Sequence, residues 1–141
     1  MRTKNKKSGF TLVELMVVAA IIAILAAIII PLMANNRERA IATEGQNICS
    51  TVATAAKVYY AEKGTWPSFA QLPQIVRNEV GNAKYFVGSG VTIGGTYDAY
   101  TITATAAANA GGLSGKTLTL NQAGTWGGTM VGTGSGQVDI Q

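Results

Sequence analysis

The longest apolar stretch of the chain lies near its beginning. Residues 15–34 contain no charged side chain and are mostly aliphatic. At about 1.5 Å per helical residue, such a run is ~30 Å long, which matches the hydrocarbon core of a bilayer. The pattern therefore predicts a helix that can cross a membrane.

Beyond a polar segment at residues 35–39, apolar side chains return at helical spacing. They are Ile41, Ile48, Val52, Ala55 and Tyr59. Arg39, Thr43, Gln46, Ser50, Thr54 and Lys57 fall on the opposite face, which is the pattern of an amphipathic helix. Lys63-Gly64 and the following Trp66-Pro67 form a stop signal. We therefore predict one helix from about Phe10 to about Lys63.

Two residues interrupt this helical pattern. Pro31 has no N–H to donate to the Ala27 carbonyl, so we expect a kink or a loosened turn there. Gly45 costs about 1 kcal/mol relative to alanine inside a helix. Both positions predict soft points along the rod.

The remainder of the chain changes from helical to alternating patterns. Pro73 suits a first turn, and we expect a short helix at about 73–80. Alternating residues indicate a half-buried antiparallel sheet of three or four strands, with threonines outward. The inward set is Tyr100, Ile102, Ala104, Leu118 and Leu120, and the outward set is Thr101, Thr103, Thr105, Thr117, Thr119 and Asn121.

The segments around these strands are predicted from their turn residues. Residues 107–114 are expected to be a connecting loop, and Gln122-Ala123-Gly124 a turn into a further strand with Trp126, Met130 and Val131. The tail at 132–136 is expected to be flexible, with 138–140 a last edge strand.

These elements together predict an α+β fold, in which the long N-terminal helix packs on a small C-terminal antiparallel sheet. We therefore divide the chain into four segments: a leader at 1–9, a transmembrane helix at 10–34, the amphipathic half of the same helix at 35–63 and a globular head at 64–141.

Charge is concentrated in the leader. Arg2, Lys4, Lys6 and Lys7 are four of the 11 basic residues, and the rest of the chain has as many acidic as basic side chains. The net charge of +4 therefore does not indicate a nucleic-acid-binding protein. A basic segment before the apolar run favours a leader that stays cytoplasmic.

The side chains offer little for catalysis. There is no histidine, and Cys49 is the one cysteine, so an internal disulfide is excluded; we interpret Cys49 as a small packing residue, with a reactive or intersubunit thiol as the alternative. We expect no enzyme, no cofactor and no metal site. Gly88-Ser89-Gly90 and Gly94-Gly95 precede strands, which is the wrong context for a phosphate-binding loop.

Glu14 stands at the start of the apolar run, where an ionised carboxylate requires a partner. It follows the segment Gly9-Phe10-Thr11-Leu12-Val13. The basic leader, the Gly-Phe junction and this glutamate resemble the N-terminus of type IV pilins and of the pseudopilins of type II secretion. The resemblance covers about the first 60 residues.

The resemblance implies how the chain is processed and assembled. A prepilin peptidase would cut between Gly9 and Phe10 and methylate the new N-terminus. An inner-membrane assembly platform with its ATPase would then extract the subunit from membrane lipid into a helical filament, located in the periplasm or outside the cell. The new Phe10 amine would pair with Glu14 of a neighbouring copy.

Three small residues suit close packing of such helices. Ala19, Ala23 and Ala27 recur at a spacing of four, so they share one helix face and allow helices to approach. Pro31 would let the packed helix stretch or locally melt. Unlike many pilins, this chain cannot close a C-terminal loop with a disulfide. A calcium site would have Asp98 and Asp139 as its only acidic ligands beyond Glu79.

The leading hypothesis is a filament-forming pilin for adhesion, motility or DNA uptake. The first alternative is a secretion pseudopilin or minor pilin, and the alternative from another class is a monomeric membrane-anchored binding module. We interpret the aromatic residues as packing residues. The alternative is a chain of aromatic rings for electron transfer, which would require close ring spacing. The residues concerned are Tyr59, Tyr60, Trp66, Tyr85, Phe86, Tyr97 and Tyr100. DNA or a surface ligand is a further candidate partner of surface lysines, namely Lys57, Lys63, Lys84 and Lys116.

Overall fold

The fold is described from a computed structural model, in which residues 9–132 and 137–140 are placed. By internal contacts the chain divides into two compact units, residues up to Asn36 and residues from Arg37 onward. The second unit holds the hydrophobic core and the sheet.

Helix α1, Leu12–Lys63, is 52 residues long and runs through both units. Its end at Lys63 confirms the predicted stop, and Gly64 follows with a φ of 71° that glycine adopts without strain. Its first residue is Leu12 rather than Phe10, because Thr11 caps the first turn from outside the helix. The helix continues through Pro31.

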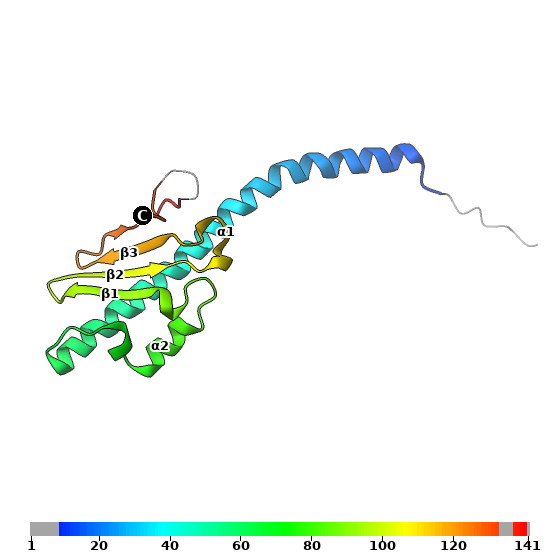
Figure 1. The fold of residues 1–141 in the computed structure, drawn as a ribbon. Helices are drawn as coiled ribbons and strands as arrows, with labels where there is room; N and C mark the ends of the chain where they lie inside the picture. The colour runs from blue at the N-terminus through cyan, green and yellow to red at the C-terminus, as the bar shows by residue number, and fades with distance from the viewer. Residues whose placement is uncertain (1–8, 133–136, 141) are drawn as a thin grey trace, which may run out of the picture. The chain divides into compact units, whose positions relative to one another are not determined.

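Four strands form an antiparallel sheet in chain order (Figure 1). They are β1 (Val91–Thr96), β2 (Ala99–Thr105), β3 (Thr117–Asn121) and β4 (Trp126–Gly127). Ile102 pairs with Ile93 on β1 and with Leu120 on β3. The alternation that we predicted for β2 and β3 is confirmed, since the apolar residues of both strands are buried and their threonines are not.

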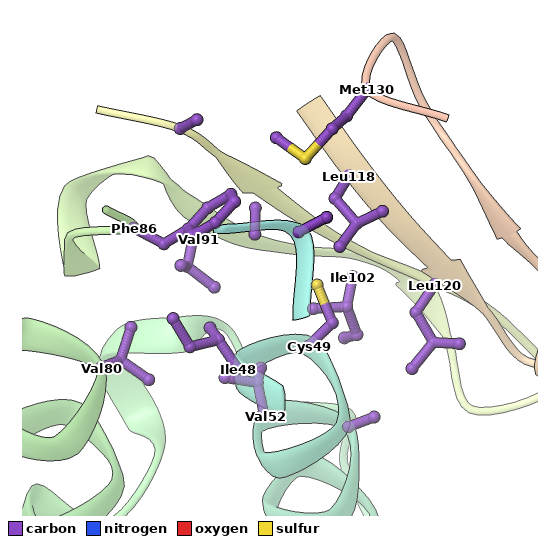
Figure 2. Packing of buried hydrophobic residues seen from close by; sticks show 14 of the residues in the cluster. Ile48, Cys49, Val52, Val80, Phe86, Val91, Ile102, Leu118, Leu120 and Met130 are labelled. Atoms are coloured by element: carbon purple, nitrogen blue, oxygen red, sulfur yellow. The ribbon is translucent and has the colours of Figure 1, made fainter. Parts of the chain in front are cut away.

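The second half of α1 packs against this sheet around one core (Figure 2). Val52 and Cys49 of α1 are fully buried, as are Ile102 and Leu118 of the sheet. Cys49 therefore packs as predicted. The α+β fold with a long helix on a small antiparallel sheet is confirmed.

The buried face of α1 is wider than the predicted stripe. Ile41, Ile48 and Val52 are buried as expected, whereas Ala55 and Tyr59 are only half-buried. Further small residues of α1 complete the face, namely Ala42, Gly45, Cys49, Ala53 and Ala56. A broad face of small residues forms because the sheet and the segment before it both contact this part of the helix.

Gly45 has a packing role that its helix propensity did not indicate. A Cβ at this position would lie 2.7 Å from Cζ of Phe86 and 3.0 Å from Cδ2 of Leu118. Phe86 and Leu118 are both fully buried. The glycine lets the helix backbone contact these side chains directly, so the soft-point interpretation does not account for it.

Segments outside the main elements required corrections. Helix α2, Gln74–Gly81, confirms the short predicted helix, and the 3-10 helices η1 (Phe69–Gln71) and η2 (Gly88–Gly90) lie on either side of it in the sequence. The expected loop at 107–114 contains a third one, η3 (Ala108–Leu113), because Ala110 and Leu113 anchor it in the core. Gly94 and Gly95, which we expected to precede a strand, lie inside β1 and pair with Thr101 and Tyr100 of β2.

The C-terminal part departs most from the prediction. Strand β4 contains two residues, and Met130 lies beyond it with its side chain fully buried. The expected edge strand at 138–140 is a single parallel bridge between Val138 and Val131. Of the tail expected to be flexible, residues 133–136 lie outside the described residues.

Candidate functional site

The predicted site residues lie just before α1 and in its first half. Gly9 and Phe10 precede the helix; nothing lies within 4 Å of a Cβ built on Gly9, and Phe10 is 84% exposed. The Gly9–Phe10 peptide bond is therefore open to approach from solvent on the described part of the chain.

Glu14 and Thr11 form a reciprocal hydrogen-bonded pair. The backbone N–H and the hydroxyl of Thr11 each donate to Oε2 of Glu14 at 2.8 Å. The N–H of Glu14 donates to Oγ1 of Thr11 at 3.3 Å. This is the capping-box arrangement, which satisfies two otherwise unpaired N–H groups of a helix N-terminus.

The capping box was missed in the sequence analysis, although the spacing Thr-x-x-Glu before an apolar run is its known signature. It changes the account of Glu14. One carboxylate oxygen has hydrogen-bond donors within its own chain, but Thr11 is neutral and leaves the negative charge uncompensated. A cationic partner can therefore still be accommodated at the same carboxylate.

The apolar run after Glu14 is exposed in this single chain. Every large hydrophobic residue from Leu12 to Met33 has about half or more of its surface accessible. This part of α1 is long and apolar enough to cross a membrane by length and composition. An exposed apolar surface of this size requires lipid or other protein to cover it.

Ala19, Ala23 and Ala27 are exposed in the same part of α1. At a spacing of four residues they share one face of the helix, where the backbone can be approached closely. Pro31 lies within the helix, which continues through it, and the kink or loosened turn that we expect at this position stays a prediction.

An aromatic cluster joins the end of α1 to the β1–β2 hairpin. Tyr60 stacks on Tyr97 with ring centroids 4.3 Å apart, and Trp66 stacks on Tyr100 at 5.0 Å. Trp66 also meets Tyr60 and Tyr97 edge to face, at 6.3 and 6.0 Å. These contacts agree with the packing interpretation and fix the chain reversal after Lys63.

Burial raises the pKa of the Cys49 thiol to about 12, so the thiol is protonated at neutral pH. Among residues 9–132 and 137–140, no three histidine, cysteine, aspartate or glutamate side chains gather as a metal-binding group.

Comparison with known proteins gives two family matches. The prokaryotic N-terminal methylation motif matches residues 4–30, and the family described as Pilin (bacterial filament) matches residues 39–137. The first match contains Gly9, Phe10, Glu14 and the three alanines, and the second covers most of the head.

Individual proteins are similar over different shares of their length. Fimbrial protein EcpC of Eikenella corrodens is 38% identical over 117 residues, which are 83% of this chain and 75% of that protein. Type II secretion system core protein G of Pseudomonas aeruginosa is 34% identical over 57% of this chain and 58% of its own.

A solved structure shares the fold. The crystal structure of the Neisseria meningitidis non-core minor pilin PilV superposes with a TM-score of 0.52 at 23% identity, covering 74% of this chain and 99% of that one. The Pilin match and the similarity to EcpC both extend over most of the sequence, and they show that this chain belongs to the pilin family.

Proposed function

We propose that this chain is a structural subunit of a type IV pilus-like filament, which polymerises from the membrane through the N-terminal part of α1. The observation that carries the proposal is the capped carboxylate of Glu14 at the beginning of an exposed apolar stretch of α1. A membrane can cover that surface before assembly, and the same surface of other copies can cover it afterwards.

Processing would supply the cation that the carboxylate lacks. Cleavage between Gly9 and Phe10 by a prepilin peptidase leaves an α-amine on Phe10, which the N-terminal methylation motif implies is then methylated. In an apolar filament core, that amine and Glu14 of a neighbouring copy compensate two charges that are each costly alone. The pair sets the register between subunits.

Other partners follow from the same proposal. An inner-membrane platform and its ATPase would lift the subunit from the bilayer into a filament that extends into the periplasm or outside the cell. Ala19, Ala23 and Ala27 would line the closest helix contacts. The alternative of a secretion pseudopilin is favoured by one observation, the similarity to core protein G.

Mass spectrometry of filaments from cells that carry the full assembly machinery tests the processing step. The expected chain begins at an N-methylated Phe10. Filaments built from chains that begin at Met1 would contradict the proposal.

A pair of substitutions tests the role of charge at Glu14. Glu14→Gln retains an oxygen that can accept from Thr11, so it keeps the cap while removing the charge. We expect Glu14→Gln and Glu14→Ala both to insert into the membrane and to assemble at least tenfold fewer filaments, consistent with the loss of at least about 1.4 kcal/mol of pairing. Filaments at wild-type levels from Glu14→Gln would refute the charge pair, and Glu38→Gln serves as the matched control.

A further inference from the structure

A pair of basic side chains meets at one aromatic ring just beyond the apolar run. The guanidinium carbon of Arg37 lies 5.7 Å from the centroid of the Tyr85 ring, and Nζ of Lys84 lies 5.1 Å from the same centroid. Arg37 and Lys84 are exposed, and Tyr85 is half-buried. We call these three residues the basic cluster.

The backbone of η3 holds Arg37 in place. Its Nη2 donates to the Asn109 carbonyl at 3.2 Å. Gly111 has a φ of 65°, and a Cβ on it would lie 2.6 Å from Nη1 of Arg37. The guanidinium therefore rests on a stretch of backbone that only glycine leaves open.

The segment that carries Lys84 and Tyr85 is fixed as well. The Asn109 side-chain amide donates to the Lys84 carbonyl at 2.8 Å. The Tyr85 N–H donates to Oε1 of Glu44 at 2.7 Å. Two elements distant in sequence thus bring two cations to one ring, so less side-chain entropy is lost when they bind a common ligand.

The local charges favour an anion. Hydrogen bonding by Lys84, and to a smaller extent by Arg37, together with the charges of both, lowers the pKa of the Tyr85 phenol, so the two cations favour negative charge beside this ring. Two carboxylates of this part of α1 face backbone: Oε1 of Glu44 accepts from the Tyr85 N–H, and Oε1 of Glu38 lies where a Cβ on Gly112 would approach to 2.8 Å.

The distance along the chain places this cluster near the bilayer surface. Arg37 follows the last residue of the apolar run by three positions, which is about 4.5 Å along a helix. Lys84 contacts the same Tyr85 ring as Arg37. Basic and tyrosine side chains both favour the headgroup region of membranes.

We propose that Arg37 and Lys84 bind the phosphate of an anionic phospholipid in the leaflet on the head side of the membrane. The proposal rests on the membrane-anchored stage of the proposed function. The guanidinium has five N–H donors, and the Asn109 carbonyl takes one of them in the described part of the chain, so a lipid phosphate has donors available. Release of this lipid would accompany extraction of the subunit.

The test uses the full chain, unassembled, in nanodiscs of equal parts phosphatidylglycerol and phosphatidylcholine. Native mass spectrometry counts the lipid molecules that stay bound when the disc is removed. The wild type should retain phosphatidylglycerol in excess. Arg37→Gln and Lys84→Gln should each lower that excess about five-fold, the equivalent of about 1 kcal/mol per basic residue at a membrane surface.

Two control variants separate this site from general charge effects. Lys63→Gln removes the same charge at the far end of α1 and should keep the excess, and Arg37→Lys retains the charge and should change it less than about two-fold. The basic residues of the leader contribute equally to all variants. Circular dichroism identifies any variant whose head is unfolded. Arg37→Lys then shows whether a lower lipid excess comes from the lost charge or from unfolding of the head.

Several outcomes would overturn the proposal. These are an unchanged excess in the double variant Arg37→Gln/Lys84→Gln, an equal loss in Lys63→Gln, or binding of inorganic phosphate at the cluster that competes with lipid on equal terms. A variant that assembles fewer filaments but keeps its lipid excess in nanodiscs would show that the cluster contacts protein instead. The lipid excess is measured on the unassembled chain, so it can be interpreted even if the chain proves unable to form filaments.

Discussion

Substitution of Gly45 by alanine sets helix propensity against packing. Propensity alone predicts that Gly45→Ala stabilises α1 by about 1 kcal/mol. The structure predicts the opposite, because the new methyl group would lie 2.7 Å from Cζ and 3.0 Å from Cε2 of Phe86. The sign of the measured change therefore decides which effect dominates at this position.

The magnitude follows from how little the neighbours can move. The Phe86 ring and Leu118 have no accessible surface, so a shift of several tenths of an ångström must be passed on to other core residues. Overpacking of this kind costs about 1–3 kcal/mol. After the gain in helix propensity of about 1 kcal/mol, we expect a net loss of up to about 2 kcal/mol.

Thermal unfolding of the full chain in detergent micelles, followed by near-ultraviolet circular dichroism of the aromatic residues, measures this loss. For a domain of this size it corresponds to a melting temperature lower by up to about 16 °C. Gly81→Ala is the matched control, since Gly81 ends α2 and nothing lies within 4 Å of a Cβ built there. That variant should melt at or above the wild-type temperature.

A Gly45→Ala chain that melts above the wild type would refute the reasoning. The double variant Gly45→Ala/Phe86→Leu adds a second check. Once the Phe86 ring is removed, Gly45→Ala should destabilise the chain less than it does in the wild type. If both substitutions were simply additive, the contact with Phe86 would not be the cause.

Three further outcomes are expected. Thr11→Val removes the hydroxyl that accepts from the Glu14 N–H; amide exchange at Glu14 should rise about five-fold for a cap worth ~1 kcal/mol, whereas Thr11→Ser should preserve protection. Burial raises the pKa of the Cys49 thiol to about 12, so as the pH rises the unfolded chain loses the thiol proton before the folded chain does. The free energy of unfolding of the wild type should therefore fall from about pH 9 upward, and Cys49→Ala should lack this contribution. Lys84→Gln should raise the pKa of Tyr85 in a tyrosinate absorbance titration, with Tyr85→Phe identifying the step; an unchanged titration would contradict the positive field at the ring.

Much of the architecture was predictable because it depends on local signals. The stop at Lys63-Gly64 and the inward alternation of Tyr100, Ile102 and Ala104 need only neighbouring residues, and the structure confirms both. The junction of Gly9 and Phe10 with Glu14 was recognisable for the same reason, and the methylation motif covers it.

The features that were missed depend on distant contacts. The 3-10 helix η3 forms where Ala110 and Leu113 reach the core, and polar residues and glycines around them suggested a loop. Gly45 could be understood only once Phe86 and Leu118 were placed against it. Arg37 and Lys84 lie 47 positions apart, so no local pattern joins them at Tyr85.

The Thr11–Glu14 cap is a different case, since its signature was present in the sequence. From the sequence, Glu14 was interpreted only as a charge that needs a cation. Its second role, as a hydrogen-bond acceptor for the first turn, became visible when the donors were placed at 2.8 Å.

The sheet has each strand beside its neighbour in sequence, from β1 to β4. Such nearest-neighbour pairing has a kinetic consequence, because short loops close quickly and the search for partners stays local. In the membrane-anchored stage that we propose, a new copy crowded among others would then leave its strand edges unpaired only briefly. Cross-pairing between copies, the usual route to aggregation, would have little time to begin.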